Sequence, residues 1–206
     1  MMRLISFILI ILVLASCKKN DDNRILGTDP EVANGCDTGF YPNWETSRYV
    51  LPYPVGQSYT IGLSHCSGFP HIEGEPDQFA IDFVMNVGTL VVASRKGTIM
   101  YVEESANDFE PTDNVVVLRD EDGRFLHYRH LTNNGALVEV GQFVERGDPI
   151  GYSGASGNAS YPHLHFVATG FDDWPEYTTS YPVTFGNTSS NPKSLIQFET
   201  YEALPY

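Results

Sequence analysis

The chain has 206 residues, with 26 acidic against 12 basic side chains and a formal net charge of −14. Binding to phosphate needs a basic face, so this balance argues against a nucleic-acid partner. The length is enough for one domain with a sizeable hydrophobic core, and nothing in the sequence indicates two.

Residues 1–16 predict an export signal. Arg3 is followed by an apolar run too short for a comfortable membrane span, and then by small residues. Leu14-Ala15-Ser16-Cys17 is typical of a lipobox, so we expect cleavage before Cys17 and lipid on its thiol. The mature chain would then carry 11 − 26 = −15 charges and would be an extracytoplasmic lipoprotein, on the periplasmic face or the cell surface. A plain signal peptide or an uncleaved anchor is the alternative.

Residues 17–50 are rich in Asn, Asp, Gly and Pro, which predicts a lipid-anchored tether followed by an extended segment. Once Cys17 is lipidated, Cys36 and Cys66 are the remaining thiols, in a compartment that permits disulfides. The sequence therefore predicts a bond between them. A nucleophilic pair of Cys66 and His65 is disfavoured, because loop neighbours seldom face each other and no orienting partner is evident.

Strand patterns dominate residues 51–170, and no long stretch there has the 3.6-residue period of an amphipathic helix. Asp122-Gly123 between two β-rich runs predicts a hairpin. Many short strands at fairly even spacing predict an all-β fold, a sandwich or barrel-like hybrid of antiparallel strands. The expected strands are Tyr59–Leu63, Phe79–Met85, Leu90–Ala93, Thr98–Glu103, Asn114–Arg119, Arg124–Leu131, Gln142–Val144, Ile150–Tyr152 and His163–Thr169.

Residues 171–206 are rich in Tyr, Pro, Thr and Asn, which predicts an aromatic coil packed on the same domain. In the alternative interpretation, Trp174, Tyr177 and Tyr181 form the wall of a substrate groove.

Histidines and one aspartate gather on the expected strands. His163 and His165 form a His-x-His pair in YPHLHFVAT, and alternate strand residues point to the same face. His130 lies in FLHYRHL and Asp82 in QFAIDFVM. Neutral imidazoles and one carboxylate suit a catalytic zinc, which takes three protein ligands and leaves a fourth position for water. The remaining strand histidine, His127, is interpreted as a packing residue.

Such a zinc would lower the pKa of bound water from about 15.7 toward ~7 and polarise a carbonyl, which favours amide hydrolysis. The histidines at i and i+2 are about 6.6 Å apart along a strand, so one can bind metal while the other faces substrate. Spacing alone does not assign the two roles. The serines of GYSGASGN lack the Gly-x-Ser-x-Gly spacing and are interpreted as a turn.

Four motifs follow one another between Ile61 and Gly170. AIDFVMNVGTLVVASRKGTIMYV contains the first two, YRHL is the third, and VGQFVERGDPIGYSGASGNASYPHLHF contains the last. In this order they resemble the lysostaphin/LytM-type zinc metallopeptidases, which cleave peptide cross-links in bacterial peptidoglycan. The resemblance implies a duplicated hybrid motif fold with a groove over a sheet, one zinc ion per chain, peptidoglycan stem peptides as substrate and a monomeric enzyme.

Residue by residue, the resemblance implies that Asp82 and His165 are zinc ligands, and that His130 and His163 are the catalytic histidines. Most members of the family have a ligand histidine four residues before the aspartate, where this chain has Gln78, a poor zinc ligand. Some relatives place that histidine farther upstream, and GFPHIEGEPDQFAIDF fits this pattern with His71.

His71 is therefore the expected third ligand, and His65 is the alternative. The sequence predicts a zinc endopeptidase of cell-wall peptides. One alternative is a family member that has lost zinc and acts as a wall-binding or partner-activating module, and Gln78 favours it. A second alternative is a sugar- or lipoyl-type β carrier domain. A carrier domain would not explain Asp82 together with the His-x-His pair.

Overall fold

The computed structural model describes residues 35–171 and 174–206, so the predicted signal and Cys17 lie outside the described residues. The described residues contain eleven strands and one short 3-10 helix, Trp44–Thr46. The all-β prediction is confirmed, and every strand pair is antiparallel. Among these residues, no helix has the length and apolar character that a membrane span requires.

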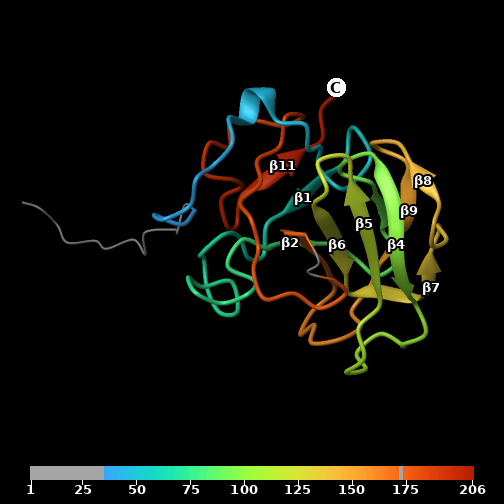
Figure 1. The fold of residues 1–206 in the computed structure, drawn as a ribbon. Coiled ribbons are helices and arrows are strands. Elements are labelled where there is room, and N and C mark those ends of the chain that lie inside the picture. Colours follow the sequence, from blue (N-terminus) through green and yellow to red (C-terminus); the bar gives the residue numbers. More distant parts are fainter. Residues whose placement is uncertain (1–34, 172–173) are drawn as a thin grey trace, which may run out of the picture. The chain divides into compact units, whose positions relative to one another are not determined.

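The largest sheet has six strands in the order β2-β10-β6-β5-β4-β8 (Figure 1). Strand β10 therefore has a hydrogen-bonded neighbour on each edge. The strands of this sheet are β2 (Ile81–Val84), β4 (Gly97–Glu103), β5 (Val115–Asp120), β6 (Phe125–Arg129), β8 (Phe143–Val144) and β10 (His163–Thr169).

Two smaller sheets complete the fold. One has the order β3-β9-β7, and the other pairs β1 with β11. The main hydrophobic core draws on all three sheets, because Phe166, Val91 and Tyr201 belong to one buried cluster. The strands of the two smaller sheets are β1 (Ser58–Thr60), β3 (Leu90–Val92), β7 (Leu131–Ala136), β9 (Pro149–Ser153) and β11 (Thr200–Glu202).

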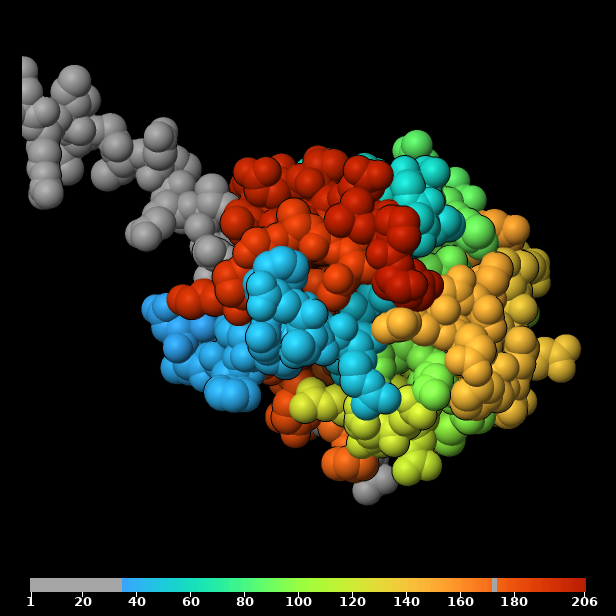
Figure 2. Space-filling view, turned by 90° about the horizontal axis from the view of Figure 1, so that it is seen from above, coloured from blue at the N-terminus to red at the C-terminus, as the bar shows by residue number. Residues whose placement is uncertain are grey.

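The C-terminal segment packs against the chain that precedes β1. In Figure 2 the red C-terminal residues lie beside the light-blue residues near position 45. The Gly186 N–H donates to the Tyr49 carbonyl at 2.9 Å, and the Leu51 N–H donates to Asn187 Oδ1 at 2.8 Å. Phe185 is fully buried in the main core. Residues beyond both ends of the predicted β domain thus contribute to one hydrophobic core.

Strands β7 and β11 were not expected from the sequence. Asn133-Asn134-Gly135 predicted a turn, but these residues lie within β7, where the pairing with β9 is irregular. Their polar side chains are tolerated because the strand is at the edge of its sheet. Strand β11 is stabilised by pairing with β1, a contact far away in sequence that local composition does not reveal.

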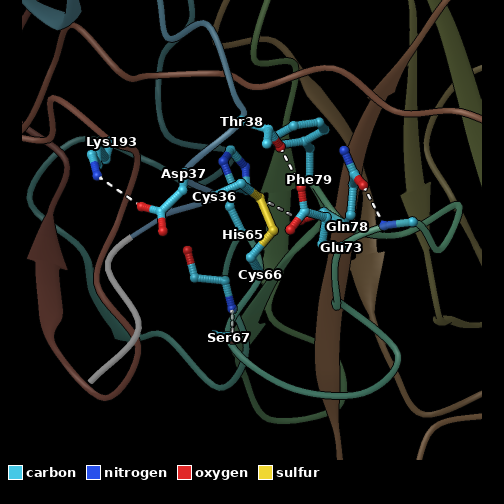
Figure 3. The surroundings of a disulfide bond; sticks show 12 residues. Cys36, Asp37, Thr38, His65, Cys66, Ser67, Glu73, Gln78, Phe79 and Lys193 are labelled. Carbon is cyan, nitrogen blue, oxygen red and sulfur yellow. Dashed lines mark hydrogen bonds and ion pairs between the residues drawn. A yellow bond between two sulfur atoms is a disulfide. The ribbon is translucent and has the colours of Figure 1, made fainter. Parts of the chain in front are cut away.

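The predicted disulfide between Cys36 and Cys66 is confirmed. It joins residues 30 positions apart and ties the N-terminal segment to the loop before β2 (Figure 3). The Cys66 N–H donates to the Gln78 carbonyl at 2.9 Å, so both ends of this loop are held at the same place. The bond thereby braces the segment that contains His71.

Candidate metal centre

The pairing of β10 with β2 brings the His-x-His pair to the aspartate. His165 lies opposite Asp82, and His163 lies opposite Val84. Because side chains alternate along a strand, both imidazoles project from the same face of the sheet. His165 Nδ1 lies 3.0 Å from Asp82 Oδ1, and His163 Nε2 lies 3.6 Å from the same oxygen.

His71 completes a buried group with Asp82 and His165. The ligand atoms of these three residues all lie within 4.8 Å of one another, and His71 Nε2 is 3.5 Å from Asp82 Oδ1. Neither ring nitrogen of His71 has a hydrogen-bond partner, although both are buried. Burial lowers the pKa of His71 to about 4, so its imidazole is neutral at pH 7. A neutral, unpaired nitrogen beside a carboxylate and a second imidazole fits the donor set of a zinc ion.

Gln78, which occupies the usual family position, and His65, the alternative ligand, both point elsewhere. Gln78 Oε1 accepts the Gly74 N–H at 2.7 Å. His65 is buried, stacks on Tyr41 at 5.6 Å between ring centroids and meets Phe79 edge to face at 5.5 Å. Figure 3 shows His65, Gln78 and Phe79 around the disulfide. Of the three candidates, His71 is the one that the structure brings to Asp82 and His165.

His130 and His163 flank this group. Their ring centroids are 4.7 Å apart, and with His165 they form a second set whose ligand atoms lie within 4.8 Å of one another. His163 Nδ1 donates to the Tyr161 carbonyl at 2.8 Å, and His130 Nδ1 donates to Asp113 Oδ1 at 3.1 Å. Since a carbonyl and a carboxylate only accept, Nδ1 of each ring carries a proton, and Nε2 is the nitrogen left for other partners.

The sequence predicted that His130 lies within a strand, and this prediction is wrong. His130 follows β6 with φ 63°, a left-handed conformation that non-glycine residues rarely adopt. Asp113 holds it there, because Oδ1 also accepts the His130 backbone N–H at 2.9 Å. The bend turns the chain from the large sheet into β7 and brings the imidazole to His163.

Sequence reasoning missed the polar residues around these histidines. His165 Nε2 lies 3.3 Å from Asp77 Oδ1 and 3.2 Å from the Tyr177 hydroxyl, which in turn donates to Asp77. Burial alone would lower the pKa of His165, but hydrogen bonds to Asp77 and Asp82 raise it to about 9. No local pattern marks Asp77, and Tyr177 was expected only as a candidate groove wall, since the two residues meet only in the folded chain.

A groove of about 670 Å³ opens over the histidines, and its lining includes Phe69, Tyr161, Arg129 and Tyr177. This volume lies within the range of about 300–1,000 Å³ that is typical of ligand pockets. Trp174 instead stacks on Phe125 of the sheet.

Tyr181 packs under the Arg124 guanidinium, at 4.6 Å from the ring centroid. Of the three aromatic residues suggested as a groove wall, Tyr177 is thus the one that lines the groove. His127 is buried on β6, with Nε2 3.0 Å from Thr169 Oγ1, in keeping with a packing role.

Part of the chain, with most of the site, matches a known family. Residues 77–173 match the model of Peptidase family M23. This segment is a peptidase M23 domain. The domain contains Asp82, His130, His163 and His165, whereas His71 precedes the matched residues.

Relatives of the M23 domain include lysostaphin from Staphylococcus staphylolyticus, 34% identical over 88 residues that cover 43% of this chain and 18% of the relative. Peptidoglycan DD-endopeptidase ShyA from Vibrio cholerae is 35% identical over 85 residues, which cover 41% of this chain and 18% of the relative. The solved structure of lysostaphin from Staphylococcus simulans matches with a TM-score of 0.42 and 33% identity, over 53% of this chain and 42% of that one. The chain thus spans under a fifth of the length of these curated relatives.

Proposed function

We propose that the chain is an extracytoplasmic zinc metallo-endopeptidase that hydrolyses peptide cross-links of bacterial peptidoglycan. The observation that carries this proposal is the buried group of His71, Asp82 and His165 under an open groove. Support for the substrate comes from the M23 domain and from its relatives, several of which are named for peptidoglycan or glycyl-glycine endopeptidase activity.

His71, Asp82 and His165 would hold the zinc ion. Two imidazoles and one carboxylate are a typical set for a catalytic site. When bound, zinc supplies a Lewis acid that polarises a carbonyl and makes water acidic enough to react at neutral pH. This set is preferred over His130, His163 and His165, because it includes a carboxylate and because neither buried ring nitrogen of His71 has a hydrogen-bond partner.

His130 and His163 would move the protons. Both donate through Nδ1 and keep Nε2 for proton transfer, and burial lowers the pKa of His163. A neutral imidazole accepts a proton from the attacking water and, once charged, donates to the tetrahedral oxyanion or to the leaving amine. The groove orients the peptide over these two groups.

Elemental analysis of purified protein tests the metal site. We expect close to one zinc per chain, lost in His165→Ala and in His71→Ala because each change leaves two ligands. Gln78→Ala should retain the ion, since the Gln78 amide is occupied by Gly74. Zinc loss in Gln78→Ala with retention in His71→Ala would contradict the ligand assignment.

Activity is tested by mass spectrometry of cross-linked wall fragments. Wild type should release fragments cut within the peptide bridges, whereas His130→Ala and His163→Ala should retain zinc and lose turnover by about 10²–10⁴-fold. Folded, zinc-free wild-type protein that binds wall fragments without cutting them would instead establish the binding module suggested by Gln78.

The membrane anchor is tested separately. Lipid on Cys17 is supported by the lipobox pattern in the sequence. Cells labelled with a radioactive fatty acid should incorporate label into wild type and not into Cys17→Ser. Equal labelling of both proteins, or none of either, would refute the anchor and leave the peptidase proposal intact.

A further inference from the structure

Asp77 contacts the ring nitrogen of His165 that lies away from Asp82. Because His165 Nδ1 faces Asp82 at 3.0 Å, Nε2 is the nitrogen that remains, and it lies 3.3 Å from Asp77 Oδ1. The Tyr177 hydroxyl lies 3.2 Å from the same nitrogen and donates to Asp77. Both acceptors require a proton on Nε2, so Nδ1 is the nitrogen that would supply a lone pair to a metal ion.

Asp113 contacts the ring of His130 in a similar way. Its Oδ1 accepts both the backbone N–H and the ring Nδ1–H of His130, at 2.9 and 3.1 Å. Its Oδ2 accepts Arg129 Nε at 2.6 Å, which fixes the carboxylate itself. Gly157 leaves the space for this side chain, since a Cβ at that position would lie 2.8 Å from Asp113 Cβ.

From these contacts we infer that Asp77 and Asp113 are two positioning residues with separate tasks. Asp77, assisted by Tyr177, fixes the orientation and tautomer of His165 for metal binding. Asp113 fixes the orientation and tautomer of His130 for proton transfer. The inference rests on the proposed function, and it assigns opposite tautomers to the two histidines.

The two tasks have different energetic consequences. A carboxylate behind a metal-binding imidazole makes the ligand nitrogen more basic, and removal of such a partner typically weakens metal affinity about 10–100-fold. A carboxylate behind a proton-transferring imidazole acts on turnover, where loss of general acid-base help costs about 10²–10⁴-fold. The same Asp→Asn change should therefore give different defects at the two positions.

The experiment compares Asp77→Asn and Asp113→Asn in the full chain. Zinc affinity is measured on metal-free protein by competition with a chelating dye, and kcat and KM are measured at saturating zinc on a cross-linked wall peptide. Asp77→Asn should weaken zinc binding about 10-fold or more and recover turnover when zinc is saturating. Asp113→Asn should keep the zinc affinity and lower kcat about 100-fold, with KM changed less than about twofold.

Asp122→Asn is the matched control, since this exposed side chain pairs with Arg48 and Arg95 outside the groove. Asp122→Asn should alter neither the zinc affinity nor kcat. An unchanged zinc affinity in Asp77→Asn, or an unchanged kcat in Asp113→Asn, overturns the respective role and leaves the proposed peptidase standing. A wild-type chain that holds no zinc overturns the proposed function, and the role of Asp77 with it.

Two further measurements apply where a variant fails to fold. Tyr177→Phe keeps the ring and removes only the hydroxyl, so zinc affinity should still fall. Nitrogen-15 NMR of the histidines in zinc-loaded wild type needs no variant. It should show the proton of His130 on Nδ1 and that of His165 on Nε2, and the reverse tautomer at either ring overturns the inference for that ring.

Discussion

The Asp113 carboxylate accepts hydrogen bonds from both His130 and Arg129. Burial raises the pKa of this carboxyl, but the hydrogen bond from His130 and the charges of His130 and Arg129 outweigh burial and lower the pKa to about 2. It also keeps His130 at φ 63°, a backbone conformation that costs on the order of 1 kcal/mol or more for a non-glycine residue. One carboxylate thus stabilises the fold where the imidazole would act.

Acid titration tests this effect on stability. The carboxyl has an ordinary pKa of 3.8 when unfolded and about 2 when folded, so its contribution is present above pH 4 and is lost as the pH falls toward 2. We expect Asp113→Asn to lower the free energy of unfolding by about 2 kcal/mol at pH 7 and to match wild type near pH 2. Urea unfolding across this range measures the difference, and a difference that does not change with pH would contradict the prediction.

The loop before β2 is the element that brings His71 to the sheet. The Cys36–Cys66 bond holds one part of this loop, and the hydrogen bond from Cys66 to Gln78 holds the other. His71 is buried between these attachments and β10, although the loop has little regular structure of its own. The disulfide therefore supports a side chain that no strand positions.

Removal of the disulfide should lower stability and affect His71 more than the strand residues. For a loop of 30 residues, the paired change Cys36→Ser and Cys66→Ser should cost about 3 kcal/mol in the free energy of unfolding. Denaturation of wild type with and without a reductant gives an independent measurement. A reductant that shifts the paired variant as much as wild type would show that the shift does not come from this bond.

Several of these elements follow from the sequence alone. The pattern of β10 is continuous and apolar around two histidines, so both its boundaries and its face were predictable. His71 was reached through the resemblance to relatives whose ligand histidine lies farther upstream. Asp77 was not predicted, and Tyr177 was predicted only as a candidate groove wall, because their contact joins residues 100 positions apart. The bend at His130 also escaped prediction, since it depends on a side chain from another loop.

The whole molecule extends beyond its M23 domain. The C-terminal segment supplies Tyr177 to the groove and Leu195, Tyr201 and Ala203 to the main core. Much of this segment has no regular secondary structure, yet these three core residues are at most 5% exposed. We conclude that it is an integral part of the fold that carries the site.

A pair of leucine substitutions tests this conclusion. Leu195 is fully buried, so Leu195→Ala should lower the free energy of unfolding by about 2–5 kcal/mol through lost contacts and the cavity that remains. Leu204 is 42% exposed, and Leu204→Ala should have a much smaller effect. Thermal unfolding measures both. Equal, small shifts would mean that the segment is only loosely attached.

Strand β10 has one further consequence, which concerns assembly of the sheet. It is hydrogen bonded along both edges, with His165 opposite Asp82 on one side and Arg129 on the other. A slip by one residue would turn both histidines to the opposite face and present Leu164 and Phe166 in their place. Under the proposed function, only correctly aligned molecules would capture the ion. The fraction of protein that binds the ion would then report the fraction of molecules with the correct register.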